Sequence, residues 1–254
     1  MTKHKTFSQY VLFLSILIVF VFSSCSKESK YSSIKGKGKD SKQILSLPNF
    51  SSVAVYDNIN LIIDPTLSSD IAIVEGGENL IPNISLKISD NKLIIRDLNK
   101  LKWVYNYKSD VQVTVSGEKI SKLFLYDAAS IKSIGSLTSD TLFIESRDAA
   151  GSISLEFQGK KLHIYAPLGL SDMTFSGNCE SFYSYINDMH FLDAAKLQTQ
   201  YAQIHHLGTN LIKAPNTQQL GVSIENIGDV CYSGSPVILW NESKKSGKLV
   251  SGCE

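Results

Sequence analysis

Histidine and carboxylate side chains are the first candidates for chemistry in this chain, as metal ligands or as proton donors and acceptors. Four histidines follow residue 160 and none has the spacing of a zinc site; they are His163, His190, His205 and His206. His205 and His206 are neighbours, so on a β-strand their side chains would point to opposite faces. We therefore expect no metal site built from histidine.

An enzyme that acts on polysaccharide would need two carboxylates, or a base and an arginine, converging in one cleft. The only arginines are Arg96 and Arg147, and no serine lies in a G-x-S-x-G motif. The sequence therefore predicts a protein that is not an enzyme and uses no cofactor. A polysaccharide lyase or hydrolase is the alternative, and a cleft with two or more convergent acids would favour it.

Aspartates recur at or near successive turns that are rich in small residues; they are Asp127, Asp148, Asp172, Asp188 and Asp229. Carboxylates stacked about 5 Å apart repel each other, and a calcium ion would relieve that repulsion. We favour the simpler interpretation that each aspartate caps its own turn through local hydrogen bonds. The aspartates are out of register with one another, and Asn210 interrupts the series. The prediction is therefore no metal.

Trp103, Tyr105 and Tyr107 alternate within the segment LKWVYNYK, so they would share one face of a strand. Aromatic rings in a row can stack on the faces of sugars, which makes these three residues a candidate glycan-binding site. The alternative is that they pack over an end of the fold and shield a strand edge from other chains.

The first 24 residues have the features of an export signal. A basic start with Lys3 and Lys5 precedes an apolar run over residues 10–22, which is short for a membrane span. The following Ser23-Ser24-Cys25 resembles the bacterial lipoprotein signal, which implies cleavage before Cys25 and acylation of its thiol. We therefore expect an outer-membrane lipoprotein of the cell envelope, periplasmic or surface-exposed, that carries palmitate or a similar acyl chain and meets the membrane through it. An uncleaved anchor helix is the alternative.

The charge of the mature chain argues against nucleic acid as a partner. Without residues 1–24 the chain loses two of its 25 bases and none of its 24 acids, so its net charge is near −1. Its basic cluster, residues 27–42, lies in a Ser-, Gly- and Lys-rich segment that reads as a flexible spacer. A nucleic-acid-binding domain would carry a basic excess on its folded part.

Three cysteines remain once Cys25 is assigned to the lipid: Cys179, Cys231 and Cys253. Export permits a disulfide, and Cys231 with Cys253 is the pair that a short loop could close. Three small buried thiols are an equally acceptable interpretation. No CxxC motif suggests zinc.

The elements that would position these residues are strands. Short runs with β-type composition, each ended by turn residues, occupy the chain from residue 45 to 115. They are Val53–Tyr56, Asn60–Ile63, Ile71–Val74, Ile84–Ile88, Lys92–Arg96 and Val111–Val115, with a possible helical turn near Glu78–Ile81.

From Lys122 onward, β-type runs and small-residue turns repeat with a period of about twenty residues, which is typical of a solenoid. No single repeat could bury its apolar side alone, so the repeats must stack on one another to form a core. The sequence predicts an all-β fold, a parallel β-helix-like solenoid. A β-sandwich is the alternative, but the Asn-Gly and Asp-Gly signals of hairpins are missing.

The segments FSSVAVYDNINLIIDP, GGENLIPNISLKISDNKLIIR and IGDVCYSGSP, with the small-residue turns, together resemble the autotransporter-adhesin head domain GIN, a domain of unknown function in Bacteroidetes. The resemblance covers roughly residues 45–236 and implies a right-handed, pectate-lyase-like β-helix, often on lipid-anchored envelope proteins, with no known reaction. Several turns depart from the family's Ser-Gly-Ala-Gly and carry Asp-Ala-Ala or Leu-Gly-Leu-Ser.

These observations divide the chain into a signal peptide (1–24), a lipidated cysteine with a linker (25–44), a GIN-type β-helix (45–236) and a C-terminal tail or capping strand (237–254). The function they favour is a non-enzymatic, lipid-anchored adhesin or binding module for polysaccharide or a surface protein. A purely structural envelope protein is a further alternative. The sequence does not specify an oligomeric state.

Overall fold

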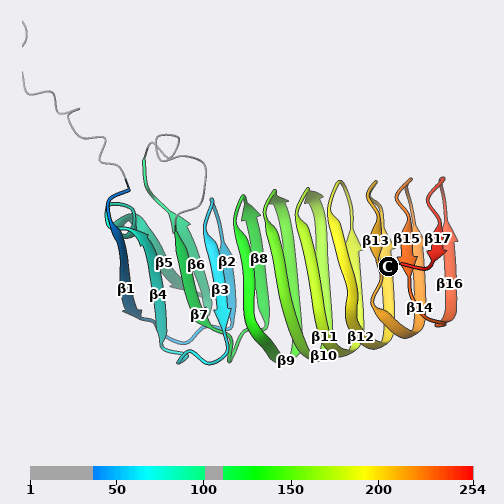
Figure 1. Ribbon diagram of the computed structural model, residues 1–254, viewed down its shortest axis with the longest axis horizontal. Coiled ribbons are helices and arrows are strands. Elements are labelled where there is room, and N and C mark those ends of the chain that lie inside the picture. Colours follow the sequence, from blue (N-terminus) through cyan, green and yellow to red (C-terminus); the bar gives the residue numbers. More distant parts are fainter. Residues whose placement is uncertain (1–36, 101–110, 254) are drawn as a thin grey trace, which may run out of the picture. The chain divides into compact units, whose positions relative to one another are not determined.

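The structure is a computed structural model that describes residues 37–100 and 111–253. Its strands form one 17-stranded sheet that winds into a parallel β-solenoid of about 6 turns (Figure 1). The all-β solenoid predicted from the repeat is therefore confirmed. The β-sandwich alternative is wrong, because the repeated strands stack in parallel register and are not joined as hairpins. Within the described residues, no helix is long and apolar enough to cross a membrane.

The strands before the repeat are short, and one 3-10 helix, η1, separates two of them. They are β1 (Asp40–Ser46), β2 (Ser52–Val55), β3 (Asn60–Asp64), β4 (Ile71–Gly77), η1 (Ile81–Asn83), β5 (Ile84–Ser89), β6 (Lys92–Asp97) and β7 (Gln112–Ser116).

The strands of the repeat are β8 (Lys122–Asp127), β9 (Ser130–Ala149), β10 (Ser152–Gly169), β11 (Asp172–Ile186), β12 (Phe191–His206), β13 (Ile212–Lys213), β14 (Asn216–Ile224), β15 (Val230–Tyr232), β16 (Val237–Ser243) and β17 (Leu249–Ser251). Four of them, β9–β12, are longer than the others, because in them the chain rounds a corner of the solenoid without losing its β-pairing.

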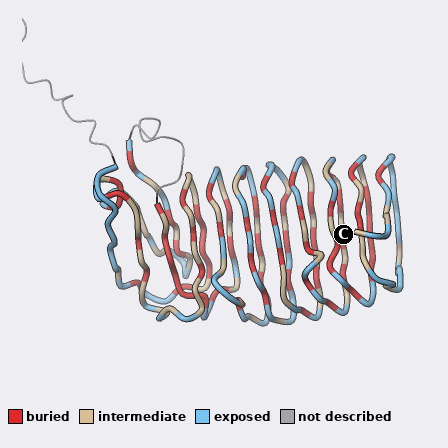
Figure 2. The backbone as a smooth tube through the Cα atoms, viewed as in Figure 1, coloured by how far each residue is buried: buried red, intermediate tan, exposed pale blue. Residues whose placement is uncertain are grey.

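Successive coils lie in register, so side chains of one type stack in columns. Leu162 of β10 is paired with Leu142 of β9 and with Phe182 of β11, and all three are fully buried. Because side chains alternate across a strand, their neighbours face outward. Figure 2 shows this alternation of buried and exposed positions along the coils.

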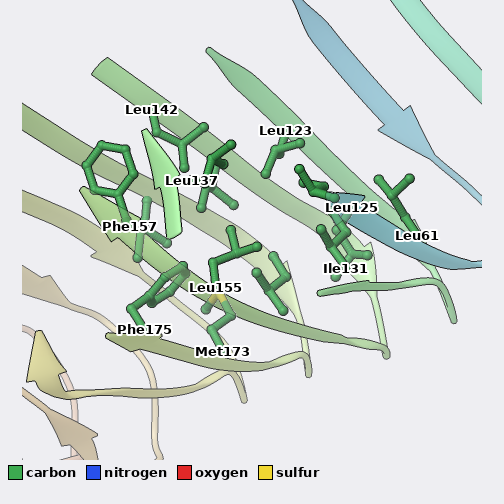
Figure 3. Close-up of a cluster of buried hydrophobic side chains, with 14 of the residues drawn as sticks. Leu61, Leu123, Leu125, Ile131, Leu137, Leu142, Leu155, Phe157, Met173 and Phe175 are labelled. Carbon is green, nitrogen blue, oxygen red and sulfur yellow. The ribbon is translucent and has the colours of Figure 1, made fainter. Parts of the chain in front are cut away.

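The core is a continuous apolar interior that runs along the solenoid. Figure 3 shows Leu155, Phe157, Met173 and Phe175 from neighbouring coils among the clustered side chains. Each of them is at most 3% exposed. A fully buried leucine or phenylalanine contributes roughly 1.5–3 kcal/mol, so the stacking of coils is the main source of stability.

The N-terminal part is not a regular parallel coil. There β1 pairs with β4, β4 with β7 and β5 with β6, all antiparallel. The β5–β6 hairpin turns at Asp90 and Asn91, whose φ angles of 51° and 60° suit the type I′ turns that join hairpins. This dipeptide replaces the Asn-Gly signal whose absence argued against hairpins, so the inference holds for the repeat but not for this region.

The ends of the folded part differ from the predicted boundaries. Residues 40–44, assigned to the linker, belong to β1 and pair with β4. Residues 237–251 form the last coil, in which β16 pairs with β14 and β17 with β15.

A disulfide joins Cys231 to Cys253, with Cα atoms 5.6 Å apart, and Cys179 is a free, buried thiol.

Candidate functional site

One outer face of the solenoid carries a concentration of aromatic rings, which we call the aromatic face. It is the outward side of β6, β2 and β8, of the second halves of β9–β12, and of β14 and β16. Its ring-bearing residues are Tyr56, Phe124, Tyr126, Phe143, His163, Tyr165, Tyr183, Tyr185, Tyr201 and Trp240.

Five of these rings form a continuous ladder, one from each of five consecutive coils. The ring centroids of Phe124 and Phe143 are 6.3 Å apart, and those of Phe143 and His163 are 5.5 Å apart. The ladder continues at 5.8 Å from His163 to Tyr183 and at 5.7 Å from Tyr183 to Tyr201. These separations lie in the range of favourable aromatic pairs.

Two shorter ring pairs lie beside the ladder. Tyr165 and Tyr185 are paired in register, with ring centroids 5.3 Å apart. Tyr56 and Tyr126 stack nearly parallel, with centroids 4.4 Å apart and an interplanar angle of 7°. The aromatic face is therefore up to two rings wide on each coil as well as several coils long.

The ladder is neutral at its centre. Partial loss of contact with water lowers the pKa of the exposed His163 imidazole below its usual value, which favours its neutral form at pH 7. Burial, with the neighbouring Tyr183, raises the pKa of Tyr201, so the phenol stays protonated and can donate a hydrogen bond. The Tyr201 hydroxyl donates to Oε1 of Gln203 over 3.1 Å, and the Gln203 amide lies 2.6 Å from Nε2 of His205.

Cations accompany the rings at the N-terminal side of the face. The Lys92 ammonium lies 4.6 Å from the ring centroid of Phe124, and the Arg96 guanidinium lies 3.9 Å from that of Tyr56. Arg147 lies 6.0 Å from the ring of Tyr165. Contacts of this kind stabilise by roughly 0.5–1 kcal/mol at exposed sites. Both arginines of the chain are therefore on this face.

Trp240 closes the opposite end of the aromatic face. Its indole lies over Gly221, where an added Cβ would come within 2.2 Å of a ring carbon. The two residues are paired in register between β14 and β16. Glycine is therefore required here so that the ring can lie on the backbone of the preceding coil.

Three of the five turn aspartates, Asp127, Asp188 and Asp229, bond to the backbone of a neighbouring coil. Asp127 Oδ2 accepts a hydrogen bond of 3.0 Å from the backbone N–H of Asp57, and Asp188 Oδ2 accepts one of 3.0 Å from Gly169. Both aspartates adopt left-handed φ angles of 54° and 58°, which aspartate tolerates better than most residues. The bonds cross to the adjacent coil, whereas the sequence suggested that each carboxylate caps its own turn.

The described residues contain no cluster of three or more histidines, cysteines or carboxylates that could hold a metal ion. His190 is buried at a corner, where its Nδ1 lies 2.8 Å from the hydroxyl of Ser171. His206 is also buried and its Nε2 lies 2.8 Å from the carbonyl oxygen of Asn210. His205 is on the outer face, so the two neighbouring histidines point to opposite sides as predicted.

The sequence-predicted site residues are only partly placed by the structure. Cys25 and the row Trp103, Tyr105 and Tyr107 lie outside the described residues, so the lipidation and the first glycan-binding site stay predictions. The aromatic face was missed. Its signal was present in the paired motifs His-Ile-Tyr at 163–165 and Tyr-Ser-Tyr at 183–185, which become one surface only when the repeat is aligned at its twenty-residue spacing.

A family model described as "Putative auto-transporter adhesin, head GIN domain" matches residues 49–236. The chain belongs to this family. The GIN match runs from just before β2 to the start of the last coil, and so contains the whole aromatic ladder. A comparison with curated proteins found no match.

Solved structures similar to this GIN domain share its fold. A crystal structure of a putative adhesin from Bacteroides fragilis has a TM-score of 0.73 at 18% identity, covering 84% of this chain and 97% of that chain. One from Parabacteroides distasonis has a TM-score of 0.68 at 14% identity, covering 85% and 98%. One from Parabacteroides merdae has a TM-score of 0.63 at 17% identity, covering 86% and 98%. The names of the family and these structures indicate an adhesin-like cell-envelope or surface protein.

Proposed function

We propose that this protein is a lipid-anchored, non-enzymatic adhesin whose GIN domain binds glycans on its aromatic face. The observation that carries the proposal is the ladder of five rings, Phe124, Phe143, His163, Tyr183 and Tyr201.

Sugar rings have an apolar C–H face, which packs against aromatic rings and removes apolar surface of both from water. The ladder offers such platforms on successive coils, which are spaced by about 4.8 Å in a β-sheet. Gln203, His205 and Tyr201 supply hydrogen-bonding groups at its C-terminal side for the hydroxyls of a bound sugar. A rigid sheet presents these groups at a small conformational cost on binding, which favours affinity.

The anchor is proposed from the sequence. Acylation of Cys25 would hold the protein at a membrane, and the spacer that follows would keep the domain free to meet a ligand. Labelling cells with a palmitate analogue tests this step. We expect label on the wild-type protein and none on Cys25→Ser; equal labelling of both would reject the anchor.

The row Trp103, Tyr105 and Tyr107 is proposed as a second sugar-stacking segment, because alternating aromatic residues share one face of an extended chain. Trp103→Ala and Tyr183→Ala, each compared with the wild type, test the two segments separately.

A glycan array probed with the full-length protein in detergent tests the binding function. We expect the wild type to retain a subset of glycans, Tyr183→Ala to lose most of that signal, and Thr174→Ala, which changes an outward residue on the other side of the solenoid, to behave as the wild type. An array with no bound glycan would reject glycan binding, and equal binding by all three proteins would reject the aromatic face as its site.

A further inference from the structure

Charge is distributed unevenly along the aromatic face. The outward positions of the C-terminal half, on β11, β12, β14 and β16, carry no lysine or arginine and one acid, Glu242. The outward positions that alternate with buried residues in the N-terminal half, on β6, β2, β8 and the second halves of β9 and β10, carry one acid, Glu145, and five cations, whereas Asp97, Asp127 and Asp148 lie at the turns that end these strands and Asp140 pairs with Lys160 at the opposite corner. The five cations are Lys92, Arg96, Lys122, Arg147 and Lys161.

Among the residues that the structure describes, one of these five cations has an acidic partner. Nε of Arg147 lies 2.8 Å from Oε1 of Glu145, on the same strand. Within the described ranges, Lys92, Arg96, Lys122 and Lys161 form no ion pair. The N-terminal half therefore presents an excess of positive charge beside its aromatic rings.

Contacts between cations and aromatic rings explain the positions of only some of the five cations. Lys92 and Arg96 lie over the rings of Phe124 and Tyr56, where a cation is attracted by the π-electrons. Lys122 and Lys161 are exposed, and no ring contact or ion pair involves them among the described residues. Placing unneutralised cations close together costs free energy through repulsion, so an anion that lies between them would be attracted.

The two unpaired lysines flank the start of the ladder. Lys122 is in register with Phe143 on the next coil, and Lys161 is two residues before His163 on the same side of its strand. Residues two apart on a strand are separated by about 7 Å. An anionic group on a sugar that stacks on Phe143 or His163 would therefore lie within reach of a lysine ammonium.

We infer that the N-terminal half of the aromatic face binds the anionic part of an acidic glycan. The sugar rings stack on Phe143 and His163, and a carboxylate, sulfate or phosphate group pairs with Lys122 and Lys161. The neutral C-terminal half, with Gln203 and His205, takes uncharged sugar units of the same chain. This inference rests on the proposed function and adds the charge and the direction of the ligand.

The test compares one polymer in two charge states. The full-length protein in detergent is titrated with a uronate polymer and with its carboxyl-reduced, neutral form, at 20 mM and 500 mM NaCl. We expect tighter binding of the acidic form, by about tenfold at low salt, because several weak surface ion pairs act together. The advantage should largely disappear at high salt. Sulfated and phosphorylated saccharides form further arms that identify the preferred anion.

The double variant Lys122→Gln/Lys161→Gln should remove most of the advantage of the acidic polymer and leave binding of the neutral polymer unchanged. Lys132→Gln/Lys196→Gln, which removes two exposed lysines from the other side of the solenoid, is the matched control and should behave as the wild type. Far-UV circular dichroism and thermal unfolding establish that both variants are folded.

Equal affinity for the acidic and neutral polymers, with all anionic arms no better, would overturn the inference. So would an equal effect of the two double variants. If the neutral polymer still binds and Tyr183→Ala abolishes that binding, the proposed glycan-binding function stands and only the charge assignment fails. If no saccharide in either charge state binds, both fail together.

Discussion

The two outer sides of the solenoid cover the same core with different residues. On the aromatic face, β9–β11 present rings such as Phe143, Tyr165 and Tyr183. On the other side, which we call the polar face, the first halves of the same strands present mostly polar side chains, one exposed isoleucine, Ile134, and no ring. Its outward residues include Lys132, Ser154, Glu156, Thr174 and Ser176, and the exposed ring of Phe191 lies beyond them at the start of β12.

Both faces nevertheless have parallel pairing and buried columns, although the polar face has register shifts at Ser154/Glu156 and Thr174/Ser176. Ile153 pairs with Ile131 and Met173 beneath the polar face, just as Leu162 pairs with its neighbours beneath the aromatic face. The polar face shows that stacked coils need only their inward residues. The rings are therefore not required by the architecture, which supports the interpretation that they serve binding.

The largest expected effect comes from the core that both faces share. Phe182 is fully buried on β11, directly before the outward Tyr183. Phe182→Ala should lower the free energy of unfolding by about 3–5 kcal/mol, because it removes a buried ring and leaves a cavity. Urea unfolding followed by circular dichroism measures it. Tyr183→Ala is the matched control one residue away, and a loss as large as that of Phe182→Ala would show that the rings support the fold.

A smaller effect is expected at the corners that join the two faces. Burial lowers the pKa of His190 and of His206. The negative charges of Asp188 beside His190 and of Asp229 beside His206 raise these pKa values, but by less than burial lowers them. Burial also lowers the pKa of His163. The unfolded chain therefore binds more protons than the folded one at mildly acidic pH, so stability is full above about pH 6.5 and falls below it.

Urea unfolding at pH 7.5 and pH 5.0 measures this dependence. The fully buried His190 and His206 should account for most of the loss, because solvent screens the exposed His163. A free energy of unfolding that stays constant or rises between pH 7.5 and pH 5.0 would contradict it. Histidine resonances followed by NMR over the same range would assign the proton uptake to individual corners.

The repeat was predictable from the sequence because its physics is local. Apolar residues alternate with a period of two, and turns of small residues recur. The inward and outward positions of each coil can therefore be identified from that coil's own sequence. The N-terminal region lacks this regularity, and apart from the β5–β6 hairpin its antiparallel pairs, β1 with β4 and β4 with β7, join strands distant in sequence. No local pattern specifies such partners.

The aromatic face was less predictable than the core beneath it. Phe143, His163 and Tyr183 are each unremarkable in their own segment, and only the register of the coils places them in one column. Trp240 shows the same limit, because its position over Gly221 follows a register shift between β14 and β16. Outward residues carry no burial signal, so their grouping depends on a register that the sequence gives only approximately.

The smallest expected effect concerns the rings themselves, and it decides how far the comparison of the two faces extends. His163 and Tyr183 are paired in register with ring centroids 5.8 Å apart, and neither is buried. A double-mutant cycle with His163→Ala and Tyr183→Ala should give a coupling energy near 0.5 kcal/mol, the low end for aromatic pairs, because water screens and competes at an exposed site. Measured by urea unfolding at pH 7.5, this is small beside the effect of Phe182→Ala. A coupling above about 1.5 kcal/mol would mean that the ladder acts as an external brace between coils. The aromatic face would then contain a stabilising interaction that the polar face lacks. The presence of the rings would be explained by stability and would no longer support ligand binding.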